Sequence, residues 1–151
     1  MSLMKKIAII GSQGVGKTTF CNNLQNKAWD PRWISVESFD PETLKRNPNT
    51  SKFTIGNIEY TEFHGNYDYS SVSYTDFINK FDLVIILFDC GSKLSLEFAI
   101  KLSQNITSKF MFIGNKHDIE NKQVKEDICF KYMSLKTGEN VDEIKLQIQS
   151  L

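Results

Sequence analysis

The chain lacks the features that point to nucleic acids, membranes or secretion. Its 18 lysines and arginines balance 18 aspartates and glutamates, and the basic residues form no stripe. Nucleic acid is therefore not expected as a partner, because binding a phosphate backbone requires a basic surface. No apolar run approaches the roughly 20 residues that span a bilayer, and no secretory signal is recognisable. We therefore expect a cytoplasmic protein without a membrane span.

Cysteine is also scarce in this chain. The three cysteines, Cys21, Cys90 and Cys129, lack metal-ligand spacing and lie in apolar or amphipathic surroundings. This pattern predicts free, buried thiols in a reducing compartment. The last residues contain no cysteine for prenylation, so no lipid anchor is expected.

The chain's length fits one domain, residues 1–151, which buries roughly 68–70% of its unfolded surface. Apolar segments alternate with helical patterns, which is typical of a mostly parallel sheet covered on both faces. Strands are predicted over residues 5–10, 52–55, 58–63, 83–88, 110–113 and 128–133. Helices are predicted over residues 17–25, part of 71–79, 94–104 and 141–150. Residues 29–49, which contain all three prolines, are predicted to form an extended loop.

The most informative stretch is Gly11-Ser12-Gln13-Gly14-Val15-Gly16-Lys17-Thr18. Strand, glycine-rich loop and helix in this order is the context that a phosphate-binding P-loop requires. Lys17 would reach the β- and γ-phosphates, and the Thr18 hydroxyl would ligate Mg²⁺. The alternative is a surface glycine turn with a solvated lysine. The predicted phosphate-binding residues of this stretch are Gly11, Gln13, Gly14, Val15, Gly16, Lys17, Thr18 and Thr19.

The fold expected from these patterns is α/β, a three-layer P-loop NTPase sheet. About six mostly parallel strands would carry helices on both faces. Gly56-Asn57 suits a tight hairpin turn, so one hairpin strand would be antiparallel.

A second motif, Asn115-Lys116-His117-Asp118, follows the predicted strand 110–113. The Asp118 carboxylate could accept two hydrogen bonds from the N1–H and exocyclic amine of guanine, a pair of donors that adenine lacks. Asn115 would tie this loop to the P-loop, and the Lys116 stem would lie along the base. Alone, the motif also fits a polar turn capped by Asp118.

A third motif, Ser134-Leu135-Lys136, lies between the last predicted strand and the last helix. All three motifs follow strand ends, where open α/β sheets bind ligands. At this point the chain resembles the Ras/Rab-like small GTPases over nearly its whole length. The resemblance implies guanine binding by Asn115, Lys116, Asp118, Ser134, Leu135 and Lys136, with the Leu135 N–H on the base carbonyl. Trp29 could lie against the base edge, or be an ordinary core or surface tryptophan.

The chain departs from the family pattern after the third strand. The family carries Asp-x-x-Gly there, whereas this chain has Glu62-Phe63-His64-Gly65. Glu62 keeps the charge of the metal-binding carboxylate but moves it, and Gly65 could still contact the γ-phosphate. Asn66 stands where a glutamine usually orients the attacking water, which predicts slow hydrolysis. Gln13 could crowd the γ-phosphate or an incoming arginine.

Two further departures concern the loops. Thr43 is the best-placed candidate for the family's switch threonine on Mg²⁺, beside Thr18 and Glu62, and Thr50 and Thr54 are alternatives in or near a strand. Residues 119–133 are too few for the usual helix and strand. The loss of that helix would expose one sheet face to a partner.

These observations predict a molecular switch that binds GTP and GDP with Mg²⁺ and hydrolyses GTP slowly, with Lys17 and Asn66 as catalytic residues. Effectors, an exchange factor and an activating protein would be its partners. One alternative is a pseudo-GTPase interaction module with little or no turnover. Another is a P-loop kinase, in which Asp89 would hold the Mg²⁺ instead.

Overall fold

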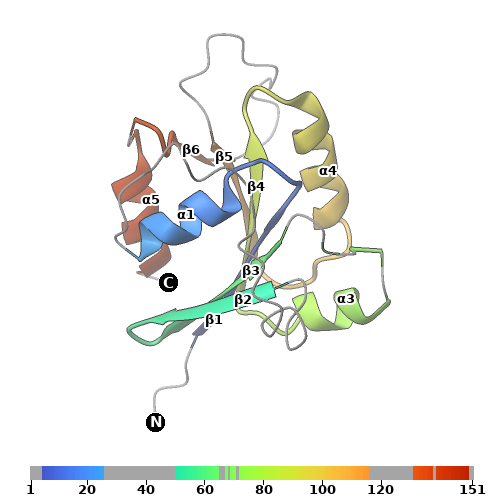
Figure 1. Cartoon of the computed structure of the whole chain (residues 1–151). Helices are drawn as coiled ribbons and strands as arrows, with labels where there is room; N and C mark the ends of the chain where they lie inside the picture. The colour runs from blue at the N-terminus through green and yellow to red at the C-terminus, as the bar shows by residue number, and fades with distance from the viewer. Residues whose placement is uncertain are drawn as a thin grey trace, which may run out of the picture.

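A computed structural model describes residues 5–25, 50–64, 67, 69–70, 72–115, 131–137 and 139–149. Strands and helices alternate along most of these residues (Figure 1). In chain order they are β1 (Lys5–Gly11), α1 (Lys17–Leu24), β2 (Thr50–Ile55), β3 (Ile58–Phe63), α3 (Val72–Ile78), β4 (Leu83–Asp89), α4 (Lys93–Ser103), β5 (Phe110–Asn115), β6 (Lys131–Tyr132) and α5 (Val141–Gln149).

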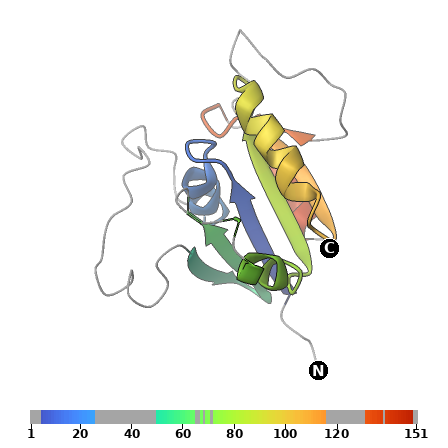
Figure 2. The ribbon, with the colours of Figure 1, turned by 90° about the vertical axis from the view of Figure 1, so that its right-hand side faces the viewer.

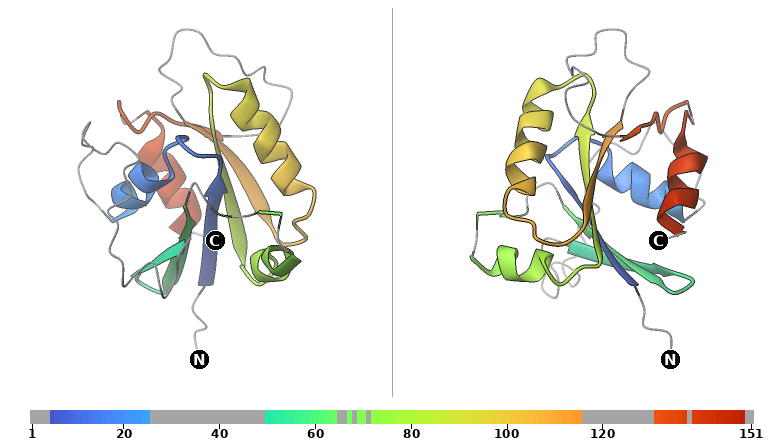
Figure 3. Two further views of the ribbon diagram at one scale, coloured as in Figure 1. Left: turned by 45° about the vertical axis from the view of Figure 1, so that its right-hand side comes forward. Right: turned by 180° about the vertical axis from the view of Figure 1, so that it is seen from behind.

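The strands form a six-stranded sheet in the order β2-β3-β1-β4-β5-β6. β2 pairs with β3 in the antiparallel sense, and the other neighbouring strands are parallel. Figures 1 and 3 show α1 and α5 on one face of the sheet and α3 and α4 on the other. Figure 2 looks onto the α4 side, where α4 runs along β4. The predicted three-layer α/β fold is therefore confirmed.

Two apolar cores lie between the three layers, because neighbouring strand residues point to opposite faces. Ile7 and Ile9 of β1 pack under α1 and α5. Ala8 and Ile10 of the same strand pack under α3 and α4. The first six residues of β4 are all buried, as the continuous apolar run predicts for a central strand.

The hairpin between β2 and β3 turns at Gly56, whose φ of 60° favours glycine. Its register places Ser51 opposite Glu62. Residues paired across an antiparallel ladder share a sheet face, so both side chains lie on the α1 face. The turn predicted at Gly56-Asn57 is confirmed, and β2 begins at Thr50, two residues before the predicted start.

Three strands continue further than predicted. β1 runs to Gly11, β4 to Asp89 and β5 to Asn115. The parallel ladder explains this, because Gly11 pairs with Leu87 and Asp89 pairs with Asn115. Gly11 and Asn115, the first residues of the glycine-rich loop and of the second motif, are therefore held by the sheet itself rather than by the loops that follow it.

The last predicted strand is seen only as the two-residue β6. Met133 lies just after the end of β6, although its N–H donates to the Gly114 carbonyl at 2.8 Å. Residues 128–130, including Cys129, lie outside the described residues. Of the described cysteines, Cys21 and Cys90 are buried and not joined in a disulfide, as expected. Within the described ranges, no helix is both long and apolar enough to cross a membrane.

Alkaline pH is expected to destabilise this fold. Burial raises the pKa of the Cys21 thiol well above its ordinary value of 9.0, and burial also raises the pKa of the Tyr60 and Tyr74 phenols. The unfolded chain loses these protons at their ordinary pKa values while the folded chain keeps them. The free energy of unfolding should therefore stay level below pH ~9 and fall above it, by about 1.4 kcal/mol per pH unit for each group.

Urea unfolding between pH 7.5 and pH 10.5 checks this expectation. The variant Cys21→Ala removes the group that titrates first, so its stability should start to fall at a higher pH than that of the wild type. A wild-type stability that stays level up to pH 10.5 would contradict the prediction.

Candidate functional site

The glycine-rich loop joins the end of β1 to the start of α1. Gly14 and Gly16 have φ values of 83° and 102°, where glycine is strongly favoured. A Cβ on Gly16 would collide with the Asn115 side-chain nitrogen, and a Cβ on Gly11 would collide with the Leu87 carbonyl oxygen. Glycine is therefore required at both ends of the loop, where the backbone approaches β4 and the end of β5.

The first turn of α1 carries no side-chain cap. Gly16 occupies its N-cap position and offers no side-chain acceptor. In α4, by contrast, the Ser92 hydroxyl accepts a hydrogen bond from the Ser95 N–H at 3.2 Å. The N-terminus of a helix has unsatisfied N–H groups and partial positive charge, which together bind phosphate. The α1 N-terminus thus has the arrangement that an anionic ligand requires.

Lys17 folds back over this loop. Its side chain is 5% exposed, and its Nζ donates to the carbonyls of Gly11 at 2.8 Å and Ser12 at 2.9 Å. These contacts hold the ammonium group above the loop rather than extending it into solvent. The alternative of a solvated surface lysine is therefore wrong.

Glu62 brings three elements together. The Thr18 hydroxyl of α1 donates to Glu62 Oε1 at 2.5 Å, and the Ser51 hydroxyl of β2 lies 3.4 Å from Glu62 Oε2. The Glu62 side chain is only 5% exposed. Glutamate in place of the family's aspartate therefore still reaches the hydroxyl of Thr18.

The pKa of the neighbouring Cys21 thiol responds to the charges of Glu62 and Lys17. Burial raises the pKa of Cys21, the negative charge of Glu62 raises it further, and the positive charge of Lys17 lowers it. Charges of opposite sign, Glu62 and Lys17, therefore both lie close enough to act on this thiol. Such a pair suits a ligand that combines a phosphate with a divalent cation.

Asn115 joins the glycine-rich loop of residues 11–16, called the phosphate loop below, to the predicted base-binding segment Ser134-Leu135-Lys136. Its Nδ2 donates to the Val15 carbonyl at 3.1 Å, and its Oδ1 accepts from the Leu135 N–H at 3.2 Å. Asn115 is 4% exposed. The predicted tie between this residue and the P-loop is present.

The segment after β6 is arranged by its own hydrogen bonds. Ser134 is fully buried, and its hydroxyl accepts from the Thr137 N–H at 3.1 Å. Leu135 is 5% exposed, whereas Lys136 is exposed. In this structure the Leu135 N–H donates to Asn115, so contact with a base carbonyl requires that donor to be shared or exchanged.

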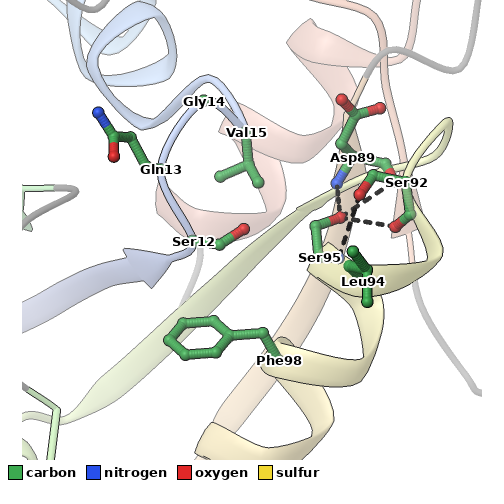
Figure 4. Close-up of a pocket in the computed structure, with 9 residues that line it drawn as sticks. All are labelled: Ser12, Gln13, Gly14, Val15, Asp89, Ser92, Leu94, Ser95 and Phe98. Carbon is green, nitrogen blue, oxygen red and sulfur yellow. Dashed lines mark hydrogen bonds between the residues drawn. The ribbon is translucent and has the colours of Figure 1, made fainter.

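A pocket of about 370 Å³ lies beside the phosphate loop, on its α4 side (Figure 4). Gln13 lines it from an exposed position, and Figure 4 shows its side chain pointing away from Asp89 and Ser92. The other lining residues are Ser12, Gly14, Val15, Leu94, Ser95 and Phe98.

Asp89 organises the turn between β4 and α4. Its Oδ1 accepts from the Gly91 N–H at 2.8 Å, and its own N–H donates to the Ser95 hydroxyl at 2.9 Å. Figure 4 shows the hydroxyls of Ser92 and Ser95 gathered around this turn. Asp89 therefore has a structural role in this turn, in place of the Mg²⁺-binding role that the P-loop kinase alternative gives it.

The structure describes about two thirds of the predicted site. It brings the loop from Gly11 to Thr19 together with Glu62 and Asn115. Six predicted residues lie outside the described residues: Trp29, Thr43, Gly65, Asn66, Lys116 and Asp118. Thr50 and Thr54 both lie in β2, and Thr54 pairs with Glu59 rather than with Glu62.

Sequence reasoning missed two residues at this site. Ser51 could have been found, because counting back from the Gly56-Asn57 turn pairs it with Glu62. Tyr69 could not, since its hydroxyl contacts Gly11, which lies 58 positions away along the chain. No local pattern of apolar or polar residues signals a contact over that separation.

The mostly parallel sheet, the glycine-rich loop and the uncapped helix after it define a P-loop protein of the α/β class. A sequence model of the Ras family matches residues 6–149. The chain therefore belongs to the Ras family, and it is a GTP-binding small GTPase of the P-loop superfamily. A P-loop kinase is excluded by this match.

Proposed function

We propose that the protein is a molecular switch that binds GTP and GDP with Mg²⁺ and hydrolyses GTP slowly. The observation that carries this proposal is the phosphate loop, with Lys17 folded over an uncapped helix N-terminus. The N–H groups of the loop and the Lys17 ammonium would bind the phosphates and stabilise the charge that develops during transfer.

Guanine recognition is proposed for the segment around Asn115. Its bridge to Val15 and Leu135 fixes the position of that segment relative to the phosphate loop. A base held there and phosphates held at the loop would belong to one nucleotide. Asp118 and Lys116 would provide the contacts to the base, together with Ser134, Lys136 and Trp29.

The residues around Glu62 fit a magnesium ion. Mg²⁺ usually keeps several waters and binds through one or two carboxylates together with substrate phosphates. Within the described residues no cluster of three or more acidic, histidine or cysteine side chains could hold a metal alone. Thr18 and Glu62 would hold the ion with the phosphates, and Thr43 is the proposed third residue. The ion would neutralise charge on the β- and γ-phosphates.

Slow turnover is proposed from three substitutions. Asn66 is shorter than the glutamine that orients water in the family, Gln13 lines the loop where the γ-phosphate would lie, and Glu62 replaces the family's aspartate. Gly65 keeps the family's glycine, so its contact with the γ-phosphate would survive. Misplacing an attacking water costs rate even when binding is intact. The same substitutions favour the second candidate, a nucleotide-binding interaction module with little or no turnover.

Exchange factors, activating proteins and effectors are the proposed partners. They would exchange GDP for GTP, stimulate GTP hydrolysis and bind one nucleotide form, respectively. The GTP and GDP forms would differ in the residues that follow α1 and β3. Partners would distinguish those two forms.

Calorimetric titration of the nucleotide-free protein with GDP, GTP and ATP, each with and without Mg²⁺, tests the function. We expect tight binding of GDP and GTP, weak binding of ATP, and tighter binding with Mg²⁺. Single-turnover GTP hydrolysis on the same sample then separates the two candidates. Slow release of phosphate supports the switch, and none supports the interaction module. Preference for ATP would contradict both.

Replacing Glu62 by glutamine should remove much of the benefit of Mg²⁺. The variant keeps the size of the side chain and an oxygen for Thr18, but it loses the negative charge. Removing a carboxylate that supports a metal typically costs about tenfold or more in metal affinity. We therefore expect GDP to dissociate about tenfold faster in Mg²⁺ and at an unchanged rate in excess EDTA.

Glu59→Gln is the matched control, because Glu59 lies on the same strand but points to the other face of the sheet. This variant should release GDP at the wild-type rate under both conditions. Equal Mg²⁺ dependence in Glu62→Gln and wild type would show that Glu62 does not support the ion.

A further inference from the structure

Tyr69 belongs to a cluster of aromatic rings on the α3 and α4 side of the sheet. Its ring centroid is 6.3 Å from that of Phe63 in β3, 5.2 Å from that of Tyr74 in α3 and 5.7 Å from that of Phe98 in α4. Tyr67 packs against the same rings. Three elements and a neighbouring residue therefore fix the direction of the Tyr69 side chain.

The hydroxyl end of this side chain reaches the first residue of the phosphate loop. It accepts from the Gly11 N–H at 3.4 Å and donates to the Gly11 carbonyl at 3.3 Å. The Tyr69 hydroxyl thus forms hydrogen bonds with both the N–H and the carbonyl of the buried Gly11. Burial and this contact with the Gly11 backbone also set the ionisation of the phenol, with burial raising its pKa.

The Gly11 carbonyl has a second donor, because Lys17 Nζ donates to it at 2.8 Å. A lysine that turns its ammonium towards a phosphate gives up part of that contact. A buried carbonyl left without a partner is costly. With Tyr69 in place, the Gly11 carbonyl keeps a hydrogen bond when Lys17 moves to the phosphate.

We propose that Tyr69 is a positioning residue of the phosphate loop, which holds the Gly11 peptide and so allows Lys17 to bind phosphate. The proposal rests on the proposed function, since it assigns a nucleotide phosphate to Lys17. Gly11 and Lys17 serve the phosphates common to GDP and GTP, so Tyr69 supports both nucleotides equally. It also links the residues that follow β3 to the loop in front of α1.

The variant Tyr69→Phe tests this role, because it keeps the ring and its packing and removes the hydroxyl. Tyr74→Phe is the matched control, since Tyr74 belongs to the same ring cluster while the hydroxyl of Tyr69 is the one that reaches Gly11. The first measurement is hydrogen exchange of the Gly11 amide in the nucleotide-free proteins. The second is the affinity of each protein for GDP and GTP, with the ³¹P chemical shift of the bound β-phosphate.

We expect the Gly11 amide to exchange faster in Tyr69→Phe than in the wild type. The affinities for GDP and GTP should both fall by about three- to tenfold, the effect of one hydrogen bond. The ³¹P resonance of the β-phosphate should shift. Tyr74→Phe should leave all three readouts at wild-type values even where it lowers the melting temperature. Unchanged Gly11 exchange in Tyr69→Phe would overturn the proposal, as would faster exchange with unchanged affinities. If the wild type bound no guanine nucleotide, the proposed function itself would be contradicted. That result differs from equal binding by the wild type and Tyr69→Phe, which would contradict only the role of Tyr69.

Discussion

Lys17→Met is expected to weaken the binding of GDP and GTP by about 100-fold or more. The methionine keeps the length and apolar volume of the buried stem, but it removes the ammonium group that lies over the phosphate loop. Losing one partner of a desolvated, charge-assisted contact costs 2–5 kcal/mol, which corresponds to roughly 30-fold to several thousand-fold in affinity. Titration calorimetry with both nucleotides measures this directly.

The control for this experiment is Lys101→Met in the last turn of α4, an exposed lysine on the same molecule. It removes the same net charge, so it accounts for any long-range electrostatic effect on a polyanionic ligand. Melting of both nucleotide-free variants shows whether the fold is intact. Equal affinities of Lys17→Met and Lys101→Met would mean that the loop does not bind phosphate through Lys17.

The sheet and helix layers of this fold could be predicted from the sequence, because the apolar pattern of each segment indicates how that segment is buried. The continuous run of β4 can be buried on both faces only at the centre of a sheet. Gly56-Asn57 between two short segments of mostly alternating polar and apolar residues predicts the hairpin and, through it, the antiparallel edge strand. The ends of the strands were less predictable, because pairing with a neighbour decides where a ladder stops.

Asn115 shows what could and could not be predicted of the site. Its position after an apolar strand and its amide suggested a tie to the phosphate loop, and Asn115 does donate to Val15. Its second bond, to the Leu135 N–H, depends on how residues on two sides of β6 come together. For Glu62 the sequence predicts a carboxylate displaced by the longer side chain, but it does not predict which group this carboxylate meets, which in the structure is the Thr18 hydroxyl.

Asn115→Ala is expected to lower both stability and nucleotide affinity. The alanine leaves the Val15 carbonyl and the Leu135 N–H without their side-chain partner at a buried position. Each of the two buried groups that lose a hydrogen bond costs about 1–3 kcal/mol, so the free energy of unfolding should fall by about 2–6 kcal/mol. Affinity for GDP and GTP should fall as well, by about 100-fold, because the base-binding segment is no longer held against the phosphate loop.

A second asparagine separates these two effects. Asn79 also bridges distant backbone, since its Oδ1 accepts from the Thr107 N–H at 2.8 Å, but it lies after α3 and away from the phosphate loop. Asn79→Ala should therefore lower the urea midpoint and leave the affinity for GDP at the wild-type value. If Asn115→Ala also kept wild-type affinity, the bridge would stabilise the fold alone. A loss of affinity confined to Asn115→Ala would instead show that the junction between the loop and β5 belongs to the nucleotide site, because the two variants lose the same kind of bond.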